Sequence, residues 1–311
     1  MPRSNYCSTA NSCWYWSVLE LRNLGYRYPG AAQPALSGID LQLRSGECLG
    51  LLGSNGAGKT TLLSLLSGVL QAQQGEILWQ GQRSLGLVPQ QLAFYAGLKV
   101  RENLELFADL YRLRGSERRQ RLELCIACTD LGDKLQRRSD RLSGGEQRRL
   151  NFAIGLLQPA ELYLFDEATV GVDTSSRQML LNAVEQLVAA GKSAIYTSHY
   201  LDEVERVAQR ILLLHEGQVR LDLDTRQLLG DSHGLLLEWP QAGPAGLDAL
   251  LARLQLQGEF QANGVHIAVL NGEQLLEITR FVQAQDGLPS LLRFGRPSLE
   301  QLYLRLNGGR L

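Results

Sequence analysis

A glycine-rich segment, residues 53–60 (GSNGAGKT), constrains the fold of this 311-residue chain more than any other feature. The apolar run Cys48–Leu52 before it is typical of a buried strand, and the leucine-rich residues 60–70 after it are typical of a helix. Glycines let the backbone curl around phosphate oxygens and point N–H groups at them, and the helix adds its positive end. We expect Lys59 to contact the β- and γ-phosphates of a nucleotide, and the Thr60 hydroxyl to bind Mg²⁺.

Two acidic residues, Asp166 and Glu167, follow the apolar run 162–165 (LYLF). In an open α/β sheet, the carboxyl end of a buried strand faces the crevice where ligands bind. Asp166 is therefore placed to hold Mg²⁺, directly or through water. Glu167 points to the other side and can act as general base on an attacking water. The glycine-rich loop alone fits GTPases, kinases and motors equally well, and the two acids add a hydrolytic centre to it.

Strand-like and helix-like patterns alternate after these acids. The helical patterns cover residues 174–190 and 201–208, and the strand patterns cover residues 193–197 and 211–214. Alternation at this spacing predicts parallel strands joined by crossover helices. Residues 92–158 interrupt the scheme with a mainly helical pattern, which Gly115 breaks.

The chain is nearly neutral, because 31 Lys+Arg stand against 32 Asp+Glu for a formal net charge of −1. This balance excludes wrapping nucleic acid by bulk charge as its main role. Its apolar runs are far shorter than the ~18–20 residues of a membrane-spanning helix. Residues 1–17 are polar and irregular, so they do not fit a secretory signal, and we expect either a loose tail or an early choice of start codon.

The five cysteines are odd in number and scattered, which fits a reducing compartment rather than a disulfide framework. Cys125 and Cys128 have the spacing of a redox or zinc motif. They lack a second pair or a nearby histidine and sit in a helical pattern, so we expect them to pack as small apolar side chains.

Another helix is predicted to begin after Ser143, and its first turn contains two glycines that helix capping does not require. Ser143 and Glu146 have the spacing of a capping box, yet Gly144 and Gly145 cost about 1 kcal/mol each relative to alanine. Glycines are useful there when a phosphate must approach the helix N-terminus closely. Residues 142–147 (LSGGEQ) resemble the LSGGQ signature motif of the ATP-binding cassette (ABC) ATPases. The resemblance covers about residues 18–229, with the motifs in the family's order.

The resemblance implies three further site residues. Tyr28 resembles the aromatic residue that stacks on adenine, with Tyr26 as its rival. Gln90 resembles the Q-loop glutamine, which contacts Mg²⁺ and the attacking water; Gln91 is the alternative, and the preceding proline favours Gln90. His199, at the end of another apolar strand, resembles the switch histidine that contacts the γ-phosphate.

The remaining motif positions complete the implied site. Asp173 in residues 170–173 (VGVD) resembles the D-loop, which crosses a dimer interface, and Ala168 stands where the family usually has proline. The implied ATP-binding residues are Tyr28, Gly53, Ser54, Asn55, Gly56, Ala57, Gly58, Lys59, Thr60, Thr61 and Gln90. The implied catalytic residues are Glu167, His199 and Lys59, and the implied Mg²⁺ ligands are Thr60, Gln90 and Asp166. The signature residues that act on the opposite subunit are Ser143, Gly144, Gly145 and Glu146.

The implied fold is α/β, a P-loop NTPase with a mainly parallel sheet, an antiparallel N-terminal β subdomain and an inserted α-helical signature subdomain at about residues 92–158. We expect a tail at 1–17 and an ABC ATPase domain at 18–230. From residue 231 to residue 311 we expect a small α+β C-terminal domain, in which a stretch rich in proline and glycine at 240–246 is followed by a strand at 265–270 and a helix at 273–284.

The implied function is that of an ATPase subunit that binds ATP and Mg²⁺ and closes as a homodimer. Residues 94–104 and 296–304 (RPSLEQLYL) resemble segments of drug, polysaccharide and lipid exporter subunits. We therefore expect a peripheral protein at the cytoplasmic face of the membrane that powers export through a separate transmembrane permease. A soluble ABC ATPase acting on nucleic acid or ribosomes is the alternative, and a nucleotide-sensing regulatory subunit is a third. A single phosphate loop, no heptad run and the charge of −1 favour the exporter, with no nucleic acid as partner.

Overall fold

The computed structural model describes residues 17–81, 83–225, 234–241, 243–261, 263–267, 269–285, 288–295 and 299. The chain divides into two compact units, one built from residues 1–199 and 211–222 and the other from residues 200–210 and 223–311. The expected tail at 1–17 lies outside the described residues except for Ser17, which begins the first strand. The domain boundary expected near residue 230 stays a prediction.

A three-stranded antiparallel sheet has the order β2-β1-β4. Its strands are β1 (Ser17–Tyr26), β2 (Leu36–Arg44) and β4 (Gln74–Trp79). Leu21 of β1 lies opposite Leu41 of β2 on one side and Ile77 of β4 on the other, so apolar side chains meet on one face. The expected antiparallel N-terminal subdomain is confirmed.

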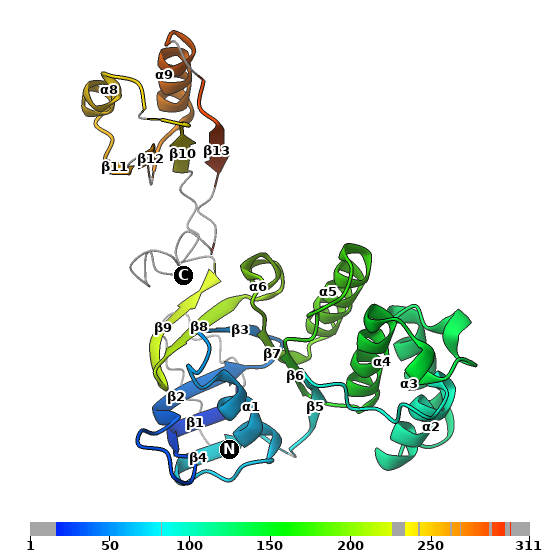
Figure 1. Ribbon diagram of the computed structural model, residues 1–311. Coiled ribbons are helices and arrows are strands. Elements are labelled where there is room, and N and C mark those ends of the chain that lie inside the picture. Colours follow the sequence, from blue (N-terminus) through cyan, green and yellow to red (C-terminus); the bar gives the residue numbers. More distant parts are fainter. Residues whose placement is uncertain are drawn as a thin grey trace, which may run out of the picture. The chain divides into compact units, whose positions relative to one another are not determined.

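A six-stranded sheet, in the order β5-β6-β7-β3-β8-β9, carries the glycine-rich loop (Figure 1). Its strands are β3 (Cys48–Leu52), β5 (Leu85–Val88), β6 (Leu162–Asp166), β7 (Ser193–Thr197), β8 (Arg210–His215) and β9 (Gln218–Asp224). Strands β5, β6, β7 and β3 pair in parallel, and every residue of β3, β6 and β7 is buried, as their apolar runs predict. Helix α1 (Lys59–Ser67) follows β3, and α5 (Thr174–Ala189) connects β6 to β7.

A mainly helical region separates β5 from β6. Its helices α2 (Val100–Leu110), α3 (Gly115–Cys128) and α4 (Gly144–Leu157) lie side by side in Figure 1. Two short 3-10 turns, Gly132–Lys134 and Ser139–Arg141, join α3 to α4. Gly115 has a φ of 54° and begins α3, so the expected break between two helices is confirmed there. All three helices fall inside the expected insertion.

Arg121 of α3 closes the C-terminal end of α4. Its guanidinium donates to the carbonyl oxygens of Leu156 (2.5 Å), Leu157 (3.2 Å) and Gln158 (2.8 Å), and to the hydroxyl of Tyr163 on β6 (2.8 Å). The last carbonyl groups of a helix have no partner within the helix, and a cation near them is favourable. Arg121 therefore fastens α3, α4 and β6 to one another.

Replacing Arg121 with methionine is expected to lower the free energy of unfolding by about 2 kcal/mol, because hydrogen bonds from a charged group contribute roughly that much. Urea unfolding followed by circular dichroism measures the change. Arg114→Met is the matched control, because Arg114 has an exposed side chain that lies 3.7 Å from Asp109 in an exposed ion pair. Equal losses in the two variants would contradict the capping role.

Cys125 and Cys128 lie at the end of α3 and pack as expected. Burial raises the pKa of the Cys125 thiol to about 12 and that of the Cys128 thiol to about 11. The Cys128 thiol donates weakly to the Cys125 carbonyl oxygen at 3.5 Å. Thiols with such high pKa values have little thiolate near neutral pH, so they are poor nucleophiles and poor metal ligands.

The second unit contains a four-stranded antiparallel sheet in the order β11-β12-β10-β13. Its strands are β10 (Gly234–Glu238), β11 (Gly258–Gln261), β12 (Gly264–Ile267) and β13 (Leu291–Gly295), and its helices are α6 (Leu201–Val207), α8 (Leu247–Arg253) and α9 (Gly272–Gln283). Leucines of β10 and α8 share one apolar cluster with Ile267 of β12 and with Ile278 and Val282 of α9. The expected small α+β region is confirmed, with β12 and α9 near the predicted strand and helix.

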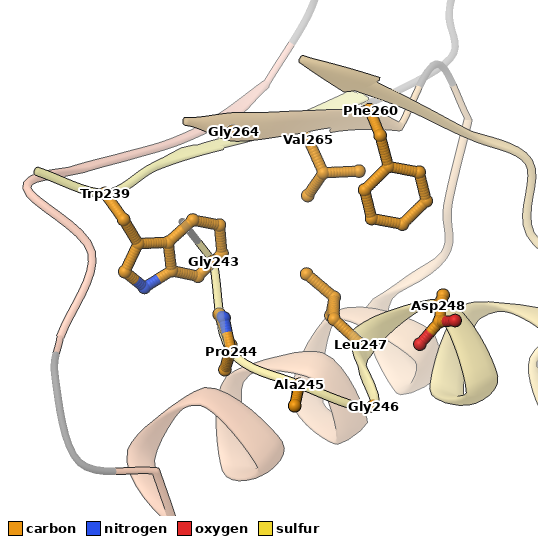
Figure 2. Close-up of a pocket in the computed structure, with 10 residues that line it drawn as sticks. All are labelled: Trp239, Gly243, Pro244, Ala245, Gly246, Leu247, Asp248, Phe260, Gly264 and Val265. Carbon is orange, nitrogen blue, oxygen red and sulfur yellow. The ribbon is translucent and has the colours of Figure 1, made fainter. Parts of the chain in front are cut away.

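A cavity of about 410 Å³ opens in this second unit (Figure 2). Its wall is largely apolar, with Trp239, Leu247, Phe260 and Val265 among the lining residues, and Asp248 is the one ionisable side chain among the described residues of that wall. The described lining residues all belong to the second unit.

The exporter-like segment expected at residues 296–304 lies outside the described residues except for Leu299. That leucine is buried, and its amide donates to a carboxylate oxygen of Glu205 at 3.1 Å. Across the described ranges, every helix is too short or too polar to cross a membrane.

Candidate nucleotide-binding and catalytic site

Four loops meet at one edge of the six-stranded sheet. Strands β5, β6, β7 and β3 are neighbours that pair in parallel, so their carboxyl ends lie together. Gln90 follows β5, Glu167 follows β6, His199 follows β7, and the glycine-rich loop follows β3. Open α/β sheets bind ligands at such an edge.

Two glycines of the loop occupy positions where the surrounding backbone leaves no room for a side chain. Gly53 has a φ of 153°, and a Cβ atom there would lie 2.5 Å from the carbonyl oxygen of Leu214. Gly58 has a φ of 107°, and a Cβ atom there would lie 2.7 Å from the carbonyl oxygen of Ala35. A larger residue at either position would displace the loop, and with it the N–H groups expected to face phosphate.

Lys59 is the first residue of α1, and its ammonium group lies within the loop. Its Nζ atom donates to the carbonyl oxygens of Gly53 at 2.7 Å and Ser54 at 3.2 Å. Burial lowers the pKa of Lys59, while the charges of Glu167 and Asp166 act in the opposite direction. The structure thus places one buried cation between the loop and both acids.

Asp166 and Glu167 are adjacent but have different partners. Oδ1 of Asp166 accepts a hydrogen bond from the Thr197 hydroxyl at 3.0 Å. In Glu167, Oε2 accepts from the side-chain amide of Gln90 at 2.6 Å, and Oε1 lies 2.7 Å from Nε2 of His199. The backbone of Glu167 has a φ of 48°, and its N–H donates to the Thr197 carbonyl oxygen at 3.2 Å. This left-handed turn directs the second carboxylate to the Gln90 and His199 loops.

The turn after Glu167 contains alanine at position 168, where the family usually has proline. Ala168 is completely buried, and the amide of Val170 donates to the carbonyl oxygen of Glu167 at 3.2 Å. This hydrogen bond closes the turn with alanine in the position where the resemblance expects proline.

Replacing Asp166 with asparagine is expected to stabilise the protein without nucleotide, increasingly as the pH rises. Burial raises the pKa of Asp166, and the Thr197 hydroxyl opposes that rise. The folded chain therefore holds this proton more tightly than the unfolded chain does. The contribution of Asp166 to the free energy of unfolding is favourable at low pH. It is lost as the pH rises from the pKa of the unfolded chain, about 3.9, through the higher pKa of the folded chain. Urea unfolding of both proteins from about pH 4 to about pH 7 measures the difference.

Asp173→Ala provides a control of opposite sign. Asp173 caps α5, and hydrogen bonds from the backbone N–H and the hydroxyl of Ser176 lower its pKa. A lowered pKa stabilises the fold above the unfolded value, and this stabilisation is lost as the pH falls. Asp173→Ala is thus expected to be less stable than the parent at neutral pH. If both variants followed the same trend with pH, the buried-carboxylate explanation would be wrong.

Tyr28 and its rival Tyr26 have different surroundings. Tyr26 is buried in the core, whereas Tyr28 is 42% exposed and its hydroxyl lies 3.3 Å from the Thr61 hydroxyl on α1. The two rings meet edge to face, with centroids 5.0 Å apart. Tyr28 thus offers a ring near the helix that follows the loop, and its stacking on adenine stays a prediction.

The signature residues form the N-terminus of α4 with the expected capping box. The Glu146 amide donates to the Ser143 hydroxyl at 3.3 Å, and the Ser143 amide donates to Glu146 Oε2 at 2.8 Å. A Cβ atom at Gly144 would meet nothing within 4 Å, whereas one at Gly145 would lie 3.4 Å from a carboxylate oxygen of Asp173. The signature motif and the D-loop aspartate are therefore neighbours, and Gly144 faces open space.

The oxygen donors at the sheet edge fit Mg²⁺. This ion prefers oxygen ligands and usually takes one or two carboxylates together with substrate phosphates and water. The described residues contain no cluster of three or more His, Cys, Asp or Glu side chains that could hold a metal ion. The expected set of a threonine hydroxyl, a glutamine side chain and one carboxylate instead leaves the remaining positions to phosphate and water.

Sequence reasoning did not identify three polar residues at this site. Thr197 holds Asp166 and the Glu167 backbone, and Arg148 and Asn151 of α4 contact the carbonyl oxygens of Gln90 and Pro89. Thr197 precedes the expected switch histidine by two residues, and the three-residue spacing of Arg148 and Asn151 places them on one helix face. These signals were present in the sequence but did not indicate a partner.

Comparison with known proteins identifies the family. A family model described as ABC transporter matches residues 36–170. The linearmycin resistance ATP-binding protein LnrL of Bacillus subtilis (strain 168) is 34% identical, over 94% of this chain and 99% of that protein. The daunorubicin resistance ATP-binding protein DrrA2 of Streptomyces coeruleorubidus is 33% identical, over 89% of this chain and 91% of that protein. The chain spans about half, 52%, of the probable multidrug ABC transporter ATP-binding protein YbhF of Escherichia coli (strain K12), at 32% identity.

Among solved structures, the fold matches a dimeric ATP-binding cassette, MJ0796, in a post-hydrolysis state bound to ADP and Pi. The TM-score is 0.61 at 24% identity, covering 67% of this chain and 99% of that one. A structural match at this identity supports the fold. The 34% identity to LnrL, which extends over nearly the full length of both chains, supports the family. This chain therefore belongs to the ATP-binding proteins of ABC transporters, a family of ATPases.

Proposed function

We propose that this ATPase powers export through a separate membrane-embedded partner. The observation that carries the proposal is the pairing of a complete hydrolytic cluster with a signature helix whose first turn is exposed at Gly144. A relative named Nod factor export ATP-binding protein I supports the direction of transport, and two relatives are named for resistance to linearmycin and daunorubicin.

The proposed reaction is attack of water on the γ-phosphorus of ATP, which breaks the bond from that phosphorus to the β–γ bridging oxygen and releases ADP and inorganic phosphate. The loop N–H groups and Lys59 bind the phosphates, and Tyr28 stacks on adenine. Thr60, Asp166 and Gln90 would hold Mg²⁺, which offsets negative charge on the phosphate oxygens when it is bound. Glu167 accepts the proton of the attacking water, and His199, hydrogen-bonded to Glu167, orients that carboxylate and contacts the γ-phosphate.

The proposed active form is a two-fold dimer. Gly144 and Ser143 are exposed at the N-terminus of α4, whose positive end suits a phosphate. In a two-fold arrangement the signature turn of each subunit faces the nucleotide on its partner, which gives two equivalent sites. ATP supplies contacts across the interface that ADP lacks, so hydrolysis would favour reopening.

We place the contact with the membrane partner on the residues that come just after Gln90 in the chain. Leu92 and Tyr95 are 42% and 56% exposed directly after Gln90. The ring of Tyr95 lies 6.3 Å from that of Phe107 on α2, which extends the aromatic surface. Exposed apolar side chains of this kind favour a protein partner. Binding there would hold the protein at the cytoplasmic face of the membrane.

The proposal is tested by searching the adjacent reading frames for a protein with several apolar segments of about 20 residues and co-expressing the chain with it. We expect the chain to fractionate with membranes only when that partner is present, and the partner to raise its ATPase rate. Tyr95→Asp is expected to abolish membrane fractionation and to leave the ATPase rate of the isolated chain unchanged. Co-sedimentation with ribosomes or nucleic acid in place of membranes would instead support the soluble alternative.

A further inference from the structure

Helix α4 carries two polar side chains, the buried Asn151 and the partly exposed Arg148, that reach the loop containing Gln90, here called the Gln90 loop (residues 89–93). Arg148 and Asn151 are three residues apart, so both lie on one helix face. Asn151 is 1% exposed, and residues 150 and 152–157 around it are buried and apolar or glycine. A polar group in such surroundings costs free energy unless it is hydrogen-bonded.

Asn151 meets this requirement by holding the Gln90 loop at both ends. Its Nδ2 atom donates to the carbonyl oxygen of Pro89 at 3.0 Å, and its Oδ1 atom accepts from the amide of Ala93 at 2.7 Å. The two hydrogen bonds flank Gln90 on either side. One side chain of the signature helix therefore sets the path of the whole loop.

Arg148 adds a contact to Gln90 itself and one to the D-loop. Its Nη1 atom donates to the carbonyl oxygen of Gln90 at 2.5 Å, and its Nε atom donates to that of Val170 at 3.2 Å. The planar guanidinium holds its donors in a fixed geometry, so the two loops are kept at a set separation. Both loops thus share an anchor on α4.

The chain of contacts continues to the expected general base. The side-chain amide of Gln90 donates to Oε2 of Glu167 at 2.6 Å. Helix α4 is one 14-residue element that begins at the signature glycines and contains Arg148 and Asn151. A displacement of its N-terminus is therefore transmitted to the Gln90 loop, because rigid helices and hydrogen-bonded loops move together.

We propose that Arg148 and Asn151 are positioning residues that make the Gln90 loop follow the signature helix, so that docking of one subunit's signature motif resets the Gln90–Glu167 contact in that subunit's own site. This inference rests on the proposed dimer. Each signature motif faces the nucleotide of the other subunit, so the two hydrolytic sites become coupled through α4. The coupling appears as cooperativity in ATP hydrolysis.

A double-mutant cycle between Asn151→Ala and Gln90→Ala tests whether Asn151 acts through Gln90. For Asn151→Ala alone, we expect kcat to fall about tenfold, which corresponds to about 1.4 kcal/mol, and the Hill coefficient to move toward one. Binding of a fluorescent ATP analogue is expected to change less than about twofold, because Asn151 lies outside the phosphate loop. In the Gln90→Ala background, the same substitution is expected to have no further effect on kcat.

Arg149→Ala is the matched control on the same helix. Its guanidinium donates to the carbonyl oxygens of Thr129 and Asp130 within the helical region, at the end of α3. Any loss of kcat from this substitution is expected to be equal in the parent and Gln90→Ala backgrounds. The proposal would be overturned if the losses of kcat from Asn151→Ala and Gln90→Ala were additive, as is expected for the control.

Two further measurements keep the result decisive. If Asn151→Ala does not fold, Asn151→Asp retains the acceptor for the Ala93 amide but loses the donor to Pro89, and a partial, equally non-additive loss is expected. Hydrogen exchange at the Ala93 amide should accelerate in Asn151→Ala. A failure of the export proposal would be seen as no response to the membrane partner, whereas the positioning proposal fails if the parent hydrolyses ATP and the cycle is additive.

Discussion

Glu167→Gln is expected to lower ATP turnover by at least about a hundredfold while an ATP-bound dimer persists. A positioned general base contributes about 10²–10⁴ in rate, and glutamine cannot accept the proton of the attacking water. The amide keeps a similar shape and can still hydrogen-bond to the Gln90 and His199 side chains that contact Glu167. Binding should therefore survive, and trapped ATP should hold the dimer closed. Steady-state phosphate release and size-exclusion chromatography with MgATP measure the two effects.

Glu161→Gln is the matched control for this prediction. Glu161 directly precedes β6, whereas Glu167 follows its other end, and Glu161 pairs with Lys192 at 2.7 Å through a side chain that is 60% exposed. An exposed ion pair of this kind contributes little to stability, so the control should hydrolyse ATP at the parental rate. Parental turnover in Glu167→Gln would remove this residue from the role of base and leave Asp166 or His199 to be tested.

The hydrolytic site could be predicted from the sequence because its residues follow recognisable strands. Apolar runs before the glycine-rich loop, before Asp166 and before His199 predicted β3, β6 and β7, and the structure has these strands buried at the predicted places. The Ser143–Glu146 capping box is likewise local, and its two hydrogen bonds are confirmed. Local pattern is sufficient where a motif lies within a few residues of a strand end.

Strand order and side-chain contacts could not be predicted in the same way. The sequence does not determine that β5 lies beside β6, and this neighbour relation brings Gln90 to Glu167. The left-handed backbone of Glu167 also depends on Thr197, which lies thirty residues further along the chain. Contacts such as those of Arg148 and Asn151 follow only once the sheet and α4 are assembled.

The second unit was predicted less completely because its elements are short. Strand β11 has four residues, and α8 follows a stretch rich in proline and glycine. These features obscure periodicity over the length needed to recognise it. Strand β9 is different, because Val219, Leu221 and Leu223 alternate with polar residues. That alternation is a strand signal, and sequence reasoning did not use it.

Mixing two inactive variants is expected to restore ATP hydrolysis if each site is shared between two subunits. Lys59→Ala removes the cation of the phosphate loop, and Gly144→Glu places an acid where the signature turn would meet phosphate. The added side chain at position 144 has open space in the isolated subunit, so the variant is expected to fold. Each variant alone carries its defect in both sites of its dimer and should be inactive.

A mixed dimer collects both defects in one site and leaves the other intact. In an equal mixture about half of the dimers are mixed, so activity should recover to about a quarter of the parental value when the two sites act independently. Coupling through α4 would lower that fraction, because the intact site would lack a working partner. Gly132→Glu controls for the added charge, since a Cβ atom there also meets nothing within 4 Å. Mixed dimers that form but remain inactive would contradict the expectation that one shared site in each mixed dimer still works independently.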